Sequence, residues 1–577
     1  MVKIGPAFGD FIRLEKSQKH QGNYDKAYSV RGYILPLILV VAAMLLVGRL
    51  FFLQVIKGSS YRNLSDSNRT RTIPIHAPRG IIFDRNGVPL VFNVPGFREI
   101  DGDKTKLIGK DEALKLISEG KTNLEVDSLR GYPYGEATTH VLGYIGQISE
   151  EELKQKQFAD YRGGDLIGKI GVEREYESML RGVDGKELVE VNSMGKIIRK
   201  LGQTDPIPGE NITLTLDSAL QVKIFEATKY MKKGAVIVSD PQGEILAMVS
   251  RPSFDPNLFT MGEGYVPNAN SAYKSISQII LDSENQPLLN RAIGGVYPPG
   301  STFKLIVAAA GLEDKVIDKN FQIEDTGILK LGAFSFGNWY FLQYGRTDGE
   351  VNIVKAIQRS NDIFFYKLAE MVGVDRLSSF AEKFGLGKRL GIDLAGEQTG
   401  TVPTEEWKKK VIGENWYLGD TYHYGIGQGF LLTTPLQVNG WTQAVANGGL
   451  IYKPHVLFSK TVFKTQKFLS EDTVSLIKQG MVEACSTGGV AWPLFDFKVP
   501  VSAQASAGKV GKSVSLACKT GTAQHGGEDT MPHAWITLFA PSDNPQIIVT
   551  VLSEDSGEGS NVAAPIAKQI LEEWFGR

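Results

Sequence analysis

The longest apolar stretch of the chain covers residues 33–56 and is interrupted only by Gly48, Arg49 and Gln54. A stretch of this length is enough for one helix to cross a bilayer. The tail of residues 1–32 is rich in lysine and arginine, and positive charge beside a membrane span tends to stay in the cytoplasm. No small-residue cleavage site follows the stretch, so we predict a single uncleaved anchor in the inner (cytoplasmic) membrane, with the large C-terminal part outside.

From about residue 210 onward the hydrophobic pattern predicts a mixture of strands and helices. β-Branched runs at 234–239 and 244–249 flank a short turn sequence, which predicts a hairpin. Another β-branched run at 547–552 predicts a strand, and a helix is expected from about 563 to 574. Because strands come from both ends of this part, we predict an α+β class with an antiparallel sheet flanked by helices.

The length of 577 residues is too great for one ordinary domain. Residues 57–209 contain short β-branched runs separated by turn sequences, which is typical of an elongated scaffold, and we predict a pedestal (dimerisation-like) domain there. A spacer with no binding role is the alternative. Residues 210–577 are expected to form the domain that carries the chemistry. Within it, residues 257–290 are polar without clear periodicity and are predicted to be a mobile loop near the site.

Composition limits the classes of function. The chain is 42% hydrophobic and 22% charged, as expected for folded protein with a core, and its formal net charge is −1. It lacks the long basic runs with interleaved aromatic residues that nucleic-acid binders show. We therefore predict that nucleic acid is not a partner.

Cysteines and histidines give little evidence of reactive chemistry. Cys485 and Cys518 allow one disulfide, and the sequence leaves open whether they pair. Cys518 directly precedes Lys519, but a small buried strand residue is a better interpretation than a nucleophile, because no histidine neighbours it in the chain. The seven histidines stand apart, without HExxH or cysteine-rich spacing. We therefore predict no catalytic metal and no cofactor.

One of the six SxxK sequences in the chain is a candidate for nucleophilic chemistry. Ser301 and Lys304 follow the sequence YPPG, which disfavours helix, and precede LIVAAA, which continues helically. In a helix, a lysine three residues after a serine lies about one turn away on the same face. Ser301 is therefore a candidate nucleophile and Lys304 its base, which requires a depressed lysine pKa. A simple N-cap is the alternative for Ser301.

A second candidate motif, Lys519-Thr520-Gly521-Thr522, occurs once and lies between two apolar runs that predict a strand pair. Gly521 lets a substrate backbone approach the strand, while the Lys519 ammonium and the threonine hydroxyls offer donors to a carboxylate. An extended peptide can dock there by adding a strand to the sheet. The alternative is a polar end of an edge strand with a solvated lysine.

The sequence Ser360-Asn361-Asp362 lies between these two motifs. Ser360 and Asp362 are candidate site residues, and for Asp362 we predict a contact with substrate. An ionised carboxylate accepts but cannot donate hydrogen bonds, so Asp362 has the alternative of holding Lys304 or Lys519. For Ser360 the alternative, which is compatible with a role in the site, is the N-cap of the helix that follows.

Together, in this order, the three motifs resemble the SxxK, SxN and KTG signatures of penicillin-binding proteins and serine β-lactamases. Three N-terminal segments extend the resemblance to the class B penicillin-binding proteins: APRGIIFDRNG from residue 77, HVLGY from residue 140 and GKIGVE from residue 168. Asp362 and the stretch 416–429 are similar to the elongation-type branch, penicillin-binding protein 2. Division-type relatives usually carry asparagine in place of that aspartate.

The resemblance implies a peptidoglycan D,D-transpeptidase. Ser301 would attack the carbonyl between two D-alanines of a stem peptide, with Lys304 as base and Ser360 as the proton relay. Lys519, with Thr520 and Thr522, would hold the substrate carboxylate. β-Lactams are expected to acylate Ser301 as substrate mimics, and the expected protein partner is a membrane glycan polymerase of the shape, elongation, division and sporulation family.

Several alternatives stay open at the level of sequence. A division-type transpeptidase differs only in cellular role, whereas a β-lactam hydrolase needs no pedestal of this length. A β-lactam receptor would show further membrane spans and usually a metalloprotease motif, and a non-catalytic scaffold should have lost part of the motif set. The metal site of some elongation-type relatives is not expected here, because residues 321–354 contain neither cysteine nor histidine.

Overall fold

The computed structural model describes residues 6–7, 10–11, 31–101, 104–121, 124–192, 196–262, 264–459, 464–499, 512–527 and 530–577. The chain divides into two compact units. The first unit comprises residues 1–73 and 187–203, and the second comprises residues 74–186 and 204–577.

The first unit contains the predicted membrane anchor. Helix α1 (Arg31–Phe51) continues as a π-helical turn, η1 (Phe52–Ile56), and is followed by α2 (Gly58–Arg69). Tyr33–Ile56 is long and apolar enough to span a membrane, and it is the single such helix in the described ranges. Its apolar side chains are exposed, so the protein itself provides no core to cover them. Strands β3 (Thr70–Ile75), β10 (Gly185–Val191) and β11 (Ile197–Thr204) form a three-stranded sheet in the order β11-β10-β3.

The part of the second unit before residue 214 is built mainly on a five-stranded sheet in the order β12-β4-β5-β6, with β7 also paired to β5. Its long central strand, β5, pairs antiparallel with β4, β6 and β7. The strands are β4 (Ile82–Phe83), β5 (Pro89–Asp101), β6 (Lys104–Gly109), β7 (Leu124–Gly131) and β12 (Ile212–Thr213). A separate pair is formed by β8 (Ile145–Gln147) and β9 (Leu166–Gly168), and the main helices here are α3 (Lys110–Ser118), α4 (Thr139–Leu142), α5 (Glu150–Leu153), α6 (Gly171–Glu175) and α7 (Glu177–Leu180).

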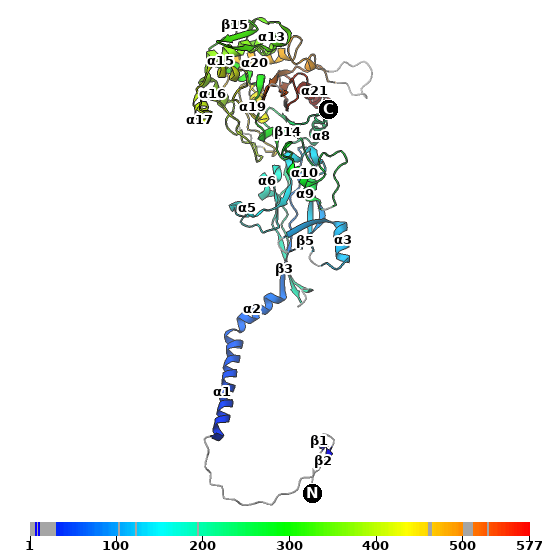
Figure 1. Ribbon diagram of the computed structural model, residues 1–577. Coiled ribbons are helices and arrows are strands. Elements are labelled where there is room, and N and C mark those ends of the chain that lie inside the picture. Colours follow the sequence, from blue (N-terminus) through cyan, green and yellow to red (C-terminus); the bar gives the residue numbers. More distant parts are fainter. Residues whose placement is uncertain are drawn as a thin grey trace, which may run out of the picture. The chain divides into compact units, whose positions relative to one another are not determined.

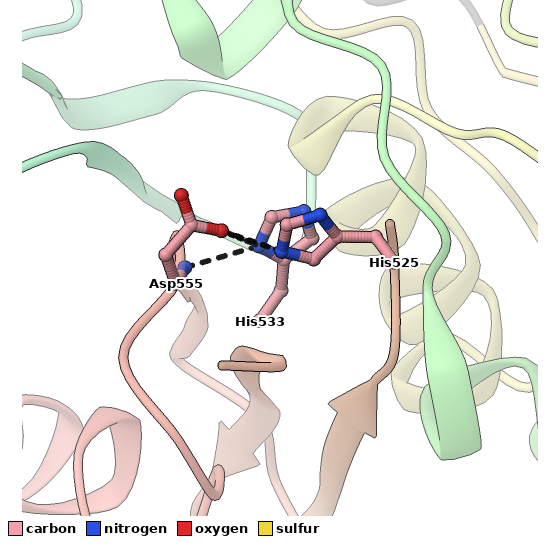
Figure 2. A group of neighbouring side chains, drawn as sticks. All are labelled: His525, His533 and Asp555. Atoms are coloured by element: carbon pink, nitrogen blue, oxygen red, sulfur yellow. Dashed lines mark hydrogen bonds and ion pairs between the residues drawn. The ribbon is translucent and has the colours of Figure 1, made fainter. Parts of the chain in front are cut away.

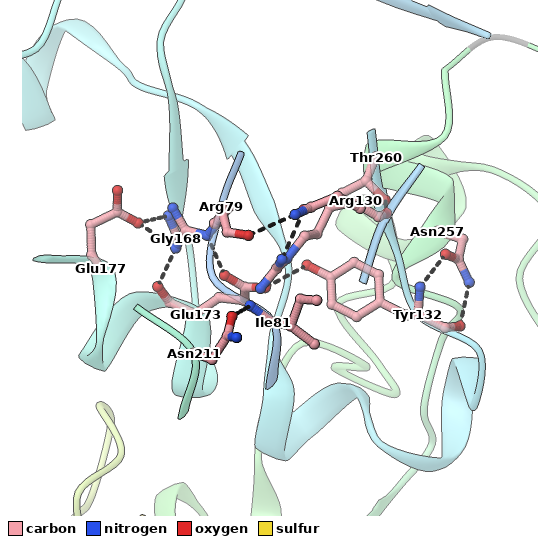
Figure 3. A network of polar contacts seen from close by, with 11 residues as sticks. Arg79, Ile81, Arg130, Tyr132, Gly168, Glu173, Glu177, Asn211, Asn257 and Thr260 are labelled. Carbon is pink, nitrogen blue, oxygen red and sulfur yellow. Dashed lines mark hydrogen bonds and ion pairs between the residues drawn. The ribbon is translucent and has the colours of Figure 1, made fainter. Parts of the chain in front are cut away.

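Buried ion pairs hold this region together (Figure 3). The Glu173 carboxylate accepts from Arg79 Nε at 2.7 Å and from Arg130 Nε at 2.7 Å, and Arg79 Nη2 also donates to Glu177 at 2.7 Å. These charges are nearly inaccessible to water, and buried charges are tolerated only when paired in this way. The sequence segments around residues 77 and 168 therefore meet in one polar network.

The segment 257–290, predicted as a mobile loop, is instead ordered against this network. It contains α9 (Asn257–Thr260) and α10 (Ile276–Leu281). Asn257 Oδ1 accepts from Tyr132 N at 2.9 Å, and Thr260 Oγ1 donates to the Arg130 carbonyl at 2.6 Å (Figure 3). The prediction was wrong because these polar residues are buried by partners distant in sequence, which no periodicity within the segment can indicate.

A five-stranded antiparallel sheet forms the centre of the C-terminal region, in the order β14-β13-β21-β20-β19. Its strands are β13 (Gly234–Ser239), β14 (Ile245–Arg251), β19 (Ala517–Ala523), β20 (His533–Ala540) and β21 (Ile547–Ser553). The predicted hairpin is β13 and β14, and the predicted C-terminal strand is β21. Both ends of the region thus contribute strands to one sheet, which confirms the α+β prediction.

Helices cover both faces of this sheet (Figure 1). On one face α8 (Ser218–Ala227) and α21 (Ala563–Phe575) pack against Ile536 and Val549. On the other face α19 (Pro435–Ala446) packs against Trp535 and Ile548. Adjacent residues of β20 point to opposite faces, as the period of two in a strand requires, and both are fully buried because both faces are covered.

The second face also carries the helical part in which the candidate site lies. Its elements are α11 (Arg291–Gly294), α12 (Lys304–Glu313), α13 (Trp339–Tyr344), α14 (Ile353–Arg359), α15 (Asp362–Val372), α16 (Val374–Lys383), α17 (Glu405–Val411), α18 (Leu418–Gly425) and α20 (Glu471–Ala484). Two small antiparallel sheets accompany them: β15 (Gln322–Asp325) pairs with β18 (Gly349–Asn352), and β16 (Ile328–Leu331) forms a hairpin with β17 (Phe334–Gly337).

Candidate active site

Ser301 lies in a short 3-10 turn, η4 (Gly300–Phe303), that leads directly into α12. This agrees with the prediction that the preceding prolines delay the helix until this position. Gly300 adopts φ of +54°, and a Cβ on it would lie 2.9 Å from the Thr522 carbonyl oxygen. The turn that carries Ser301 is therefore in close contact with the Lys519-Thr520-Gly521-Thr522 motif on β19.

Lys304 is completely buried and faces the Ser360-Asn361-Asp362 motif. Its Nζ donates to the Ser360 carbonyl at 2.8 Å and to Asp362 Oδ1 at 2.6 Å, and lies 3.4 Å from Ser360 Oγ. The second carboxylate oxygen of Asp362 accepts from Trp339 N at 2.9 Å. Both oxygens of Asp362 thus have partners within the protein, and one of them holds Lys304, the alternative weighed from the sequence.

Lys519 contacts the same hydroxyl. Its Nζ donates to Ser360 Oγ at 2.8 Å and to the Thr520 carbonyl at 3.0 Å, and the side chain is fully buried. Two lysines that are 215 residues apart in the chain therefore meet at one serine. Residues of the three sequence motifs therefore meet at the Ser360 hydroxyl.

Burial lowers the pKa of both lysines. For Lys304, desolvation lowers the pKa and the neighbouring Asp362 carboxylate opposes this change. For Lys519, desolvation lowers the pKa further below its usual range, the nearby Lys304 charge adds to the effect, and Asp362 opposes it. Two ammonium groups this close repel each other in a buried site, so the pair favours a state in which at least one lysine is neutral. A neutral lysine is the form that can remove a proton from a hydroxyl.

Ser360 is not the helix N-cap considered as its alternative. It ends α14 in the left-handed conformation, with φ of +54°, and Asn361 caps α15 by accepting from Phe364 N at 2.9 Å. The left-handed conformation is uncommon for a residue other than glycine and is maintained here by the surrounding structure. It leaves the Ser360 hydroxyl free of backbone capping and available to both lysines.

A polar cluster under the motif was not predicted from the sequence. Asn361 Nδ2 donates to Asp325 at 2.9 Å and to Asp348 at 3.1 Å, and Asn338 Nδ2 donates to Asp325 at 2.8 Å. Arg359 pairs with Asp348 at 2.9 Å. The sequence did not indicate these contacts, because Asp325 ends the short strand β15 and Asp348 directly precedes the short strand β18, and the pairing of these strands is not evident from the hydrophobic pattern. The cluster fixes the segment on which Ser360 and Asp362 lie.

β19 forms one edge of the sheet: in the described part of the chain it pairs only with β20. Its other side has unpaired backbone groups beside the Ser301 turn, where an extended chain can add as a further strand. Gly559 supports the strand, since a Cβ there would lie 2.5 Å from the Gly521 carbonyl oxygen and 2.1 Å from that of Trp535. The predicted docking surface for an extended peptide is consistent with this geometry.

The structure also resolves two points about cysteine and histidine. Cys485 and Cys518 form a disulfide, and Cys518 is a buried strand residue as interpreted from the sequence. The histidines do not all stand apart, because the rings of His525 and His533 stack with centroids 3.9 Å apart. The two histidines are apart in the sequence, and the antiparallel pairing of β19 with β20 brings them together.

This fold and site define a catalytic domain of the transpeptidase class. Residues 234–572 match the family described as "Penicillin binding protein transpeptidase domain", and residues 111–214 match "Penicillin-binding Protein dimerisation domain". The chain therefore belongs to the penicillin-binding proteins. This membership confirms the resemblance drawn from the three motifs.

Individual relatives agree with this assignment. The chain is 34% identical to the peptidoglycan D,D-transpeptidase MrdA of Escherichia coli K12, over 97% of this chain and 96% of that protein. It is similar to the crystal structure of Pseudomonas aeruginosa PBP2 in complex with WCK 5153, with a TM-score of 0.68, 34% identity and coverage of 87% and 96% of the two chains. The PBP2 of Helicobacter pylori in a complex with MreC gives a TM-score of 0.73 at 27% identity, with coverage of 88% and 99%.

Proposed function

We propose that this protein is a peptidoglycan D,D-transpeptidase that cross-links stem peptides through an acyl-enzyme on Ser301, in cell elongation. The observation that carries the proposal is the convergence of two buried lysines on the Ser360 hydroxyl, next to the Ser301 turn and an open strand edge. The name of the MrdA relatives, peptidoglycan D,D-transpeptidase, supports the reaction class. The D-alanyl substrate is taken from this relationship.

In the acylation step, neutral Lys304 accepts the proton of Ser301, and the serine oxygen attacks the carbonyl between the two D-alanines. Backbone N–H groups of Ser301 and Thr522 stabilise the oxyanion, a contribution of about 3 to 4 kcal/mol per donor in comparable sites. The C–N bond then breaks, Ser360 passes a proton to the leaving nitrogen, and the terminal D-alanine departs. Contacts of 3.4 Å and 2.8 Å from Ser360 Oγ to the two lysines support this relay.

In the second step, the amine of a neighbouring stem attacks the ester carbonyl, loses its proton through the same groups and releases Ser301. Lys519, Thr520 and Thr522 hold the substrate carboxylate, and the chain of the substrate lies along β19. Asp362 is assigned to the positioning of Lys304, because its oxygens contact Lys304 and Trp339. This positioning role replaces the contact with substrate that we predicted for Asp362 from the sequence.

The site lies in the proposed catalytic domain, residues 210–577, which follows the proposed pedestal, residues 57–209, in the chain. The apolar helix Tyr33–Ile56 and the membership of the family indicate a single-pass membrane protein. We place this anchor (residues 33–56) in the inner membrane, with residues 1–32 in the cytoplasm and the site outside, where peptidoglycan is assembled.

The proposed protein partners follow the solved relatives. One relative was solved as a complex of PBP2 with MreC. Another, 28% identical with a TM-score of 0.70, is a structure that concerns the coordination of polymerization and crosslinking by a peptidoglycan synthase complex. We therefore propose a membrane glycan polymerase of the shape, elongation, division and sporulation family as a partner.

The test is the mass of the protein after exposure to a labelled penicillin. We expect one stable label per chain on the wild type, none on Ser301→Ala, and label on Ser271→Ala, which removes the serine of another SxxK sequence. Label that persists on Ser301→Ala would reject the nucleophile. Rapid loss of label from the wild type would instead favour a β-lactam hydrolase.

A further inference from the structure

Three side chains that the proposed reaction does not use converge at one end of the catalytic sheet (Figure 2). His525 follows β19, His533 is the first residue of β20, and Asp555 follows β21. Each residue offers one ring nitrogen or carboxylate oxygen, and these atoms lie within 4.8 Å of one another. We propose that His525, His533 and Asp555 form a zinc site that joins the β19–β20 connection to the segment after β21.

One of the two ligand–ligand distances already suits a bound ion, and the other is a direct hydrogen bond that the ion would replace. Asp555 Oδ1 lies 2.5 Å from His525 Nε2 and 3.4 Å from His533 Nδ1. Ligand atoms around a tetrahedral zinc ion lie roughly 3.3 Å apart, given metal–ligand bonds near 2.0–2.1 Å. The two imidazole rings are nearly parallel, at 11°, and Figure 2 shows both directed to the same carboxylate oxygen. Small movements of the more exposed His525 and Asp555 side chains would open the space that the ion needs.

Two other contacts of these nitrogens must be exchanged on binding. His525 Nε2 lies 3.1 Å from the Met531 carbonyl, and the backbone N–H of Asp555 donates to His533 Nδ1 at 3.2 Å. Both are single, fairly long hydrogen bonds, and each contributes little net stability. Metal–ligand bonds in a site of this type are much stronger, so the exchange favours the bound ion.

The donor set and its exposure point to zinc in particular. Two imidazoles and one carboxylate are ligands that zinc accepts readily, whereas calcium and magnesium prefer oxygen ligands alone. The side chains are 8% exposed for His533, 28% for His525 and 52% for Asp555. One side of the site is therefore open, and water can supply the fourth ligand.

The position gives this ion a structural role beside the active site. His533 is paired in register with Ala523, one residue after Thr522. The ring of Tyr297 meets the His533 ring edge-on at 5.5 Å, and the Tyr297 hydroxyl donates to Glu554 at 2.7 Å. Tyr297 precedes Ser301 by four residues. The ion would therefore hold both the segment before the Ser301 turn and the end of β19, without contacting the reacting groups. This role is distinct from the catalytic metal that the sequence argued against.

The experiment measures zinc itself on the full chain in detergent, after removal of metal with a chelator. We expect one zinc per chain for the wild type, and Co(II) in its place should give the visible absorption of a tetrahedral ion. Asp555→Asn and His525→Ala should weaken zinc binding by more than about 100-fold. Asparagine tolerates the left-handed conformation of position 555, so this variant keeps the backbone.

A matched control is His455→Gln, which removes a histidine outside the cluster whose ring nitrogen Nδ1 contacts the Lys453 carbonyl. This variant should bind zinc like the wild type. Equal zinc binding by the wild type and both site variants, or no binding by the wild type at micromolar zinc, would overturn the proposal. Acylation by labelled penicillin, measured on every variant, reports whether the variant is folded. The zinc content is measured independently of the reaction of Ser301, so failure of the zinc proposal can be distinguished from failure of the proposed function.

Discussion

At the scale of single residues, the main feature of the site is a serine hydroxyl held between two buried lysines. Ser360 and Asn361 are adjacent but have different tasks: Ser360 Oγ contacts the lysines, while Asn361 caps α15 and binds Asp325 and Asp348. A chemical role and a structural role are therefore separable by substitution of neighbouring residues.

We expect Ser360→Ala to keep the fold but to slow acylation by labelled penicillin by about 10²- to 10⁴-fold, because it removes a proton relay. Asn361→Ala should lower the free energy of unfolding by at least about 1 to 2 kcal/mol, since it removes an N-cap and the partners of buried carboxylates. Thermal unfolding and acylation kinetics, measured on both variants, check this division. Equal losses of stability in the two variants would contradict it.

The second prediction concerns the pH dependence of acylation. The Asp362 carboxylate raises the pKa of Lys304 against the lowering effect of burial. Acylation needs the neutral lysine, so the rate should fall as the pH drops through that pKa. Asp362→Asn removes the raising effect and should move this acid limb to lower pH, with a lower maximal rate because Lys304 is less well positioned.

The measurement is the rate of acylation by a labelled penicillin over a pH series. Glu370→Gln is a matched control, since Glu370 lies on the same helix, α15, and contacts Lys367 and Tyr422 instead. Its acid limb should coincide with that of the wild type. A limb that moves to higher pH in Asp362→Asn would show that Lys304 is not the titrating base.

At the scale of elements, the catalytic strand β19 depends on residues far away in the sequence. Gly559 lies between β21 and α21, where a Cβ would overlap the backbone of Gly521 and Trp535. We expect Gly559→Ala to displace β19, to destabilise the protein by about 1 to 3 kcal/mol and to reduce acylation. Gly163→Ala is the control, because nothing lies within 4 Å of a Cβ at that position. Thermal unfolding and labelling by penicillin, measured on both variants, check this prediction. Unchanged labelling of Gly559→Ala would contradict the proposed support of β19.

The same example shows what the sequence could and could not predict. The hairpin of β13 and β14, the strand β21 and the helix α21 were predicted because each follows from a local period or turn. The Ser301 turn was predicted for the same reason. Gly559 was missed because its close approach to Gly521 is a property of the folded sheet, and His525, His533 and Asp555 meet only because three strands end together.

Polar residues in the core were also beyond sequence pattern. Asn257 looked like part of a solvated loop, but it is buried against Tyr132. Asp325 and Asp348 bind Asn361, a contact that no motif indicated. The sequence periodicity does not distinguish a buried, hydrogen-bonded polar side chain from an exposed one. These contacts could therefore be found only from the structure.

At the scale of the whole molecule, the junction between the pedestal and the catalytic region contains a pH-sensitive contact. His140 is buried, and its Nε2 contacts the Pro287 carbonyl at 2.8 Å. Burial lowers the pKa of His140 to about 4, and Arg291 and Arg251 add to this effect. The unfolded chain binds a proton near pH 6.5, so the contribution of neutral His140 is present above that pH and is lost as the pH falls from 6.5 towards 4.

We therefore expect the urea concentration at the midpoint of unfolding to be lower at pH 5 than at pH 7.5. This decrease should be smaller in His140→Gln. Glutamine can keep an N–H donor for Pro287 but does not titrate. Comparison of the two proteins at pH 7.5, where neither side chain is charged, controls for lost packing. Identical pH slopes for both proteins would exclude His140 as a source of the acid sensitivity.

The open edge of β19 has a consequence for how the protein responds to its inhibitors. A ligand that lies along this edge completes the hydrogen bonds of an incomplete sheet, and a covalent bond to Ser301 would keep it there. Any compound that binds the native state and not the unfolded chain raises stability by mass action. A drug that stops the enzyme would thus also protect it from degradation, and the inactive protein would accumulate in the membrane, occupying the places of active copies.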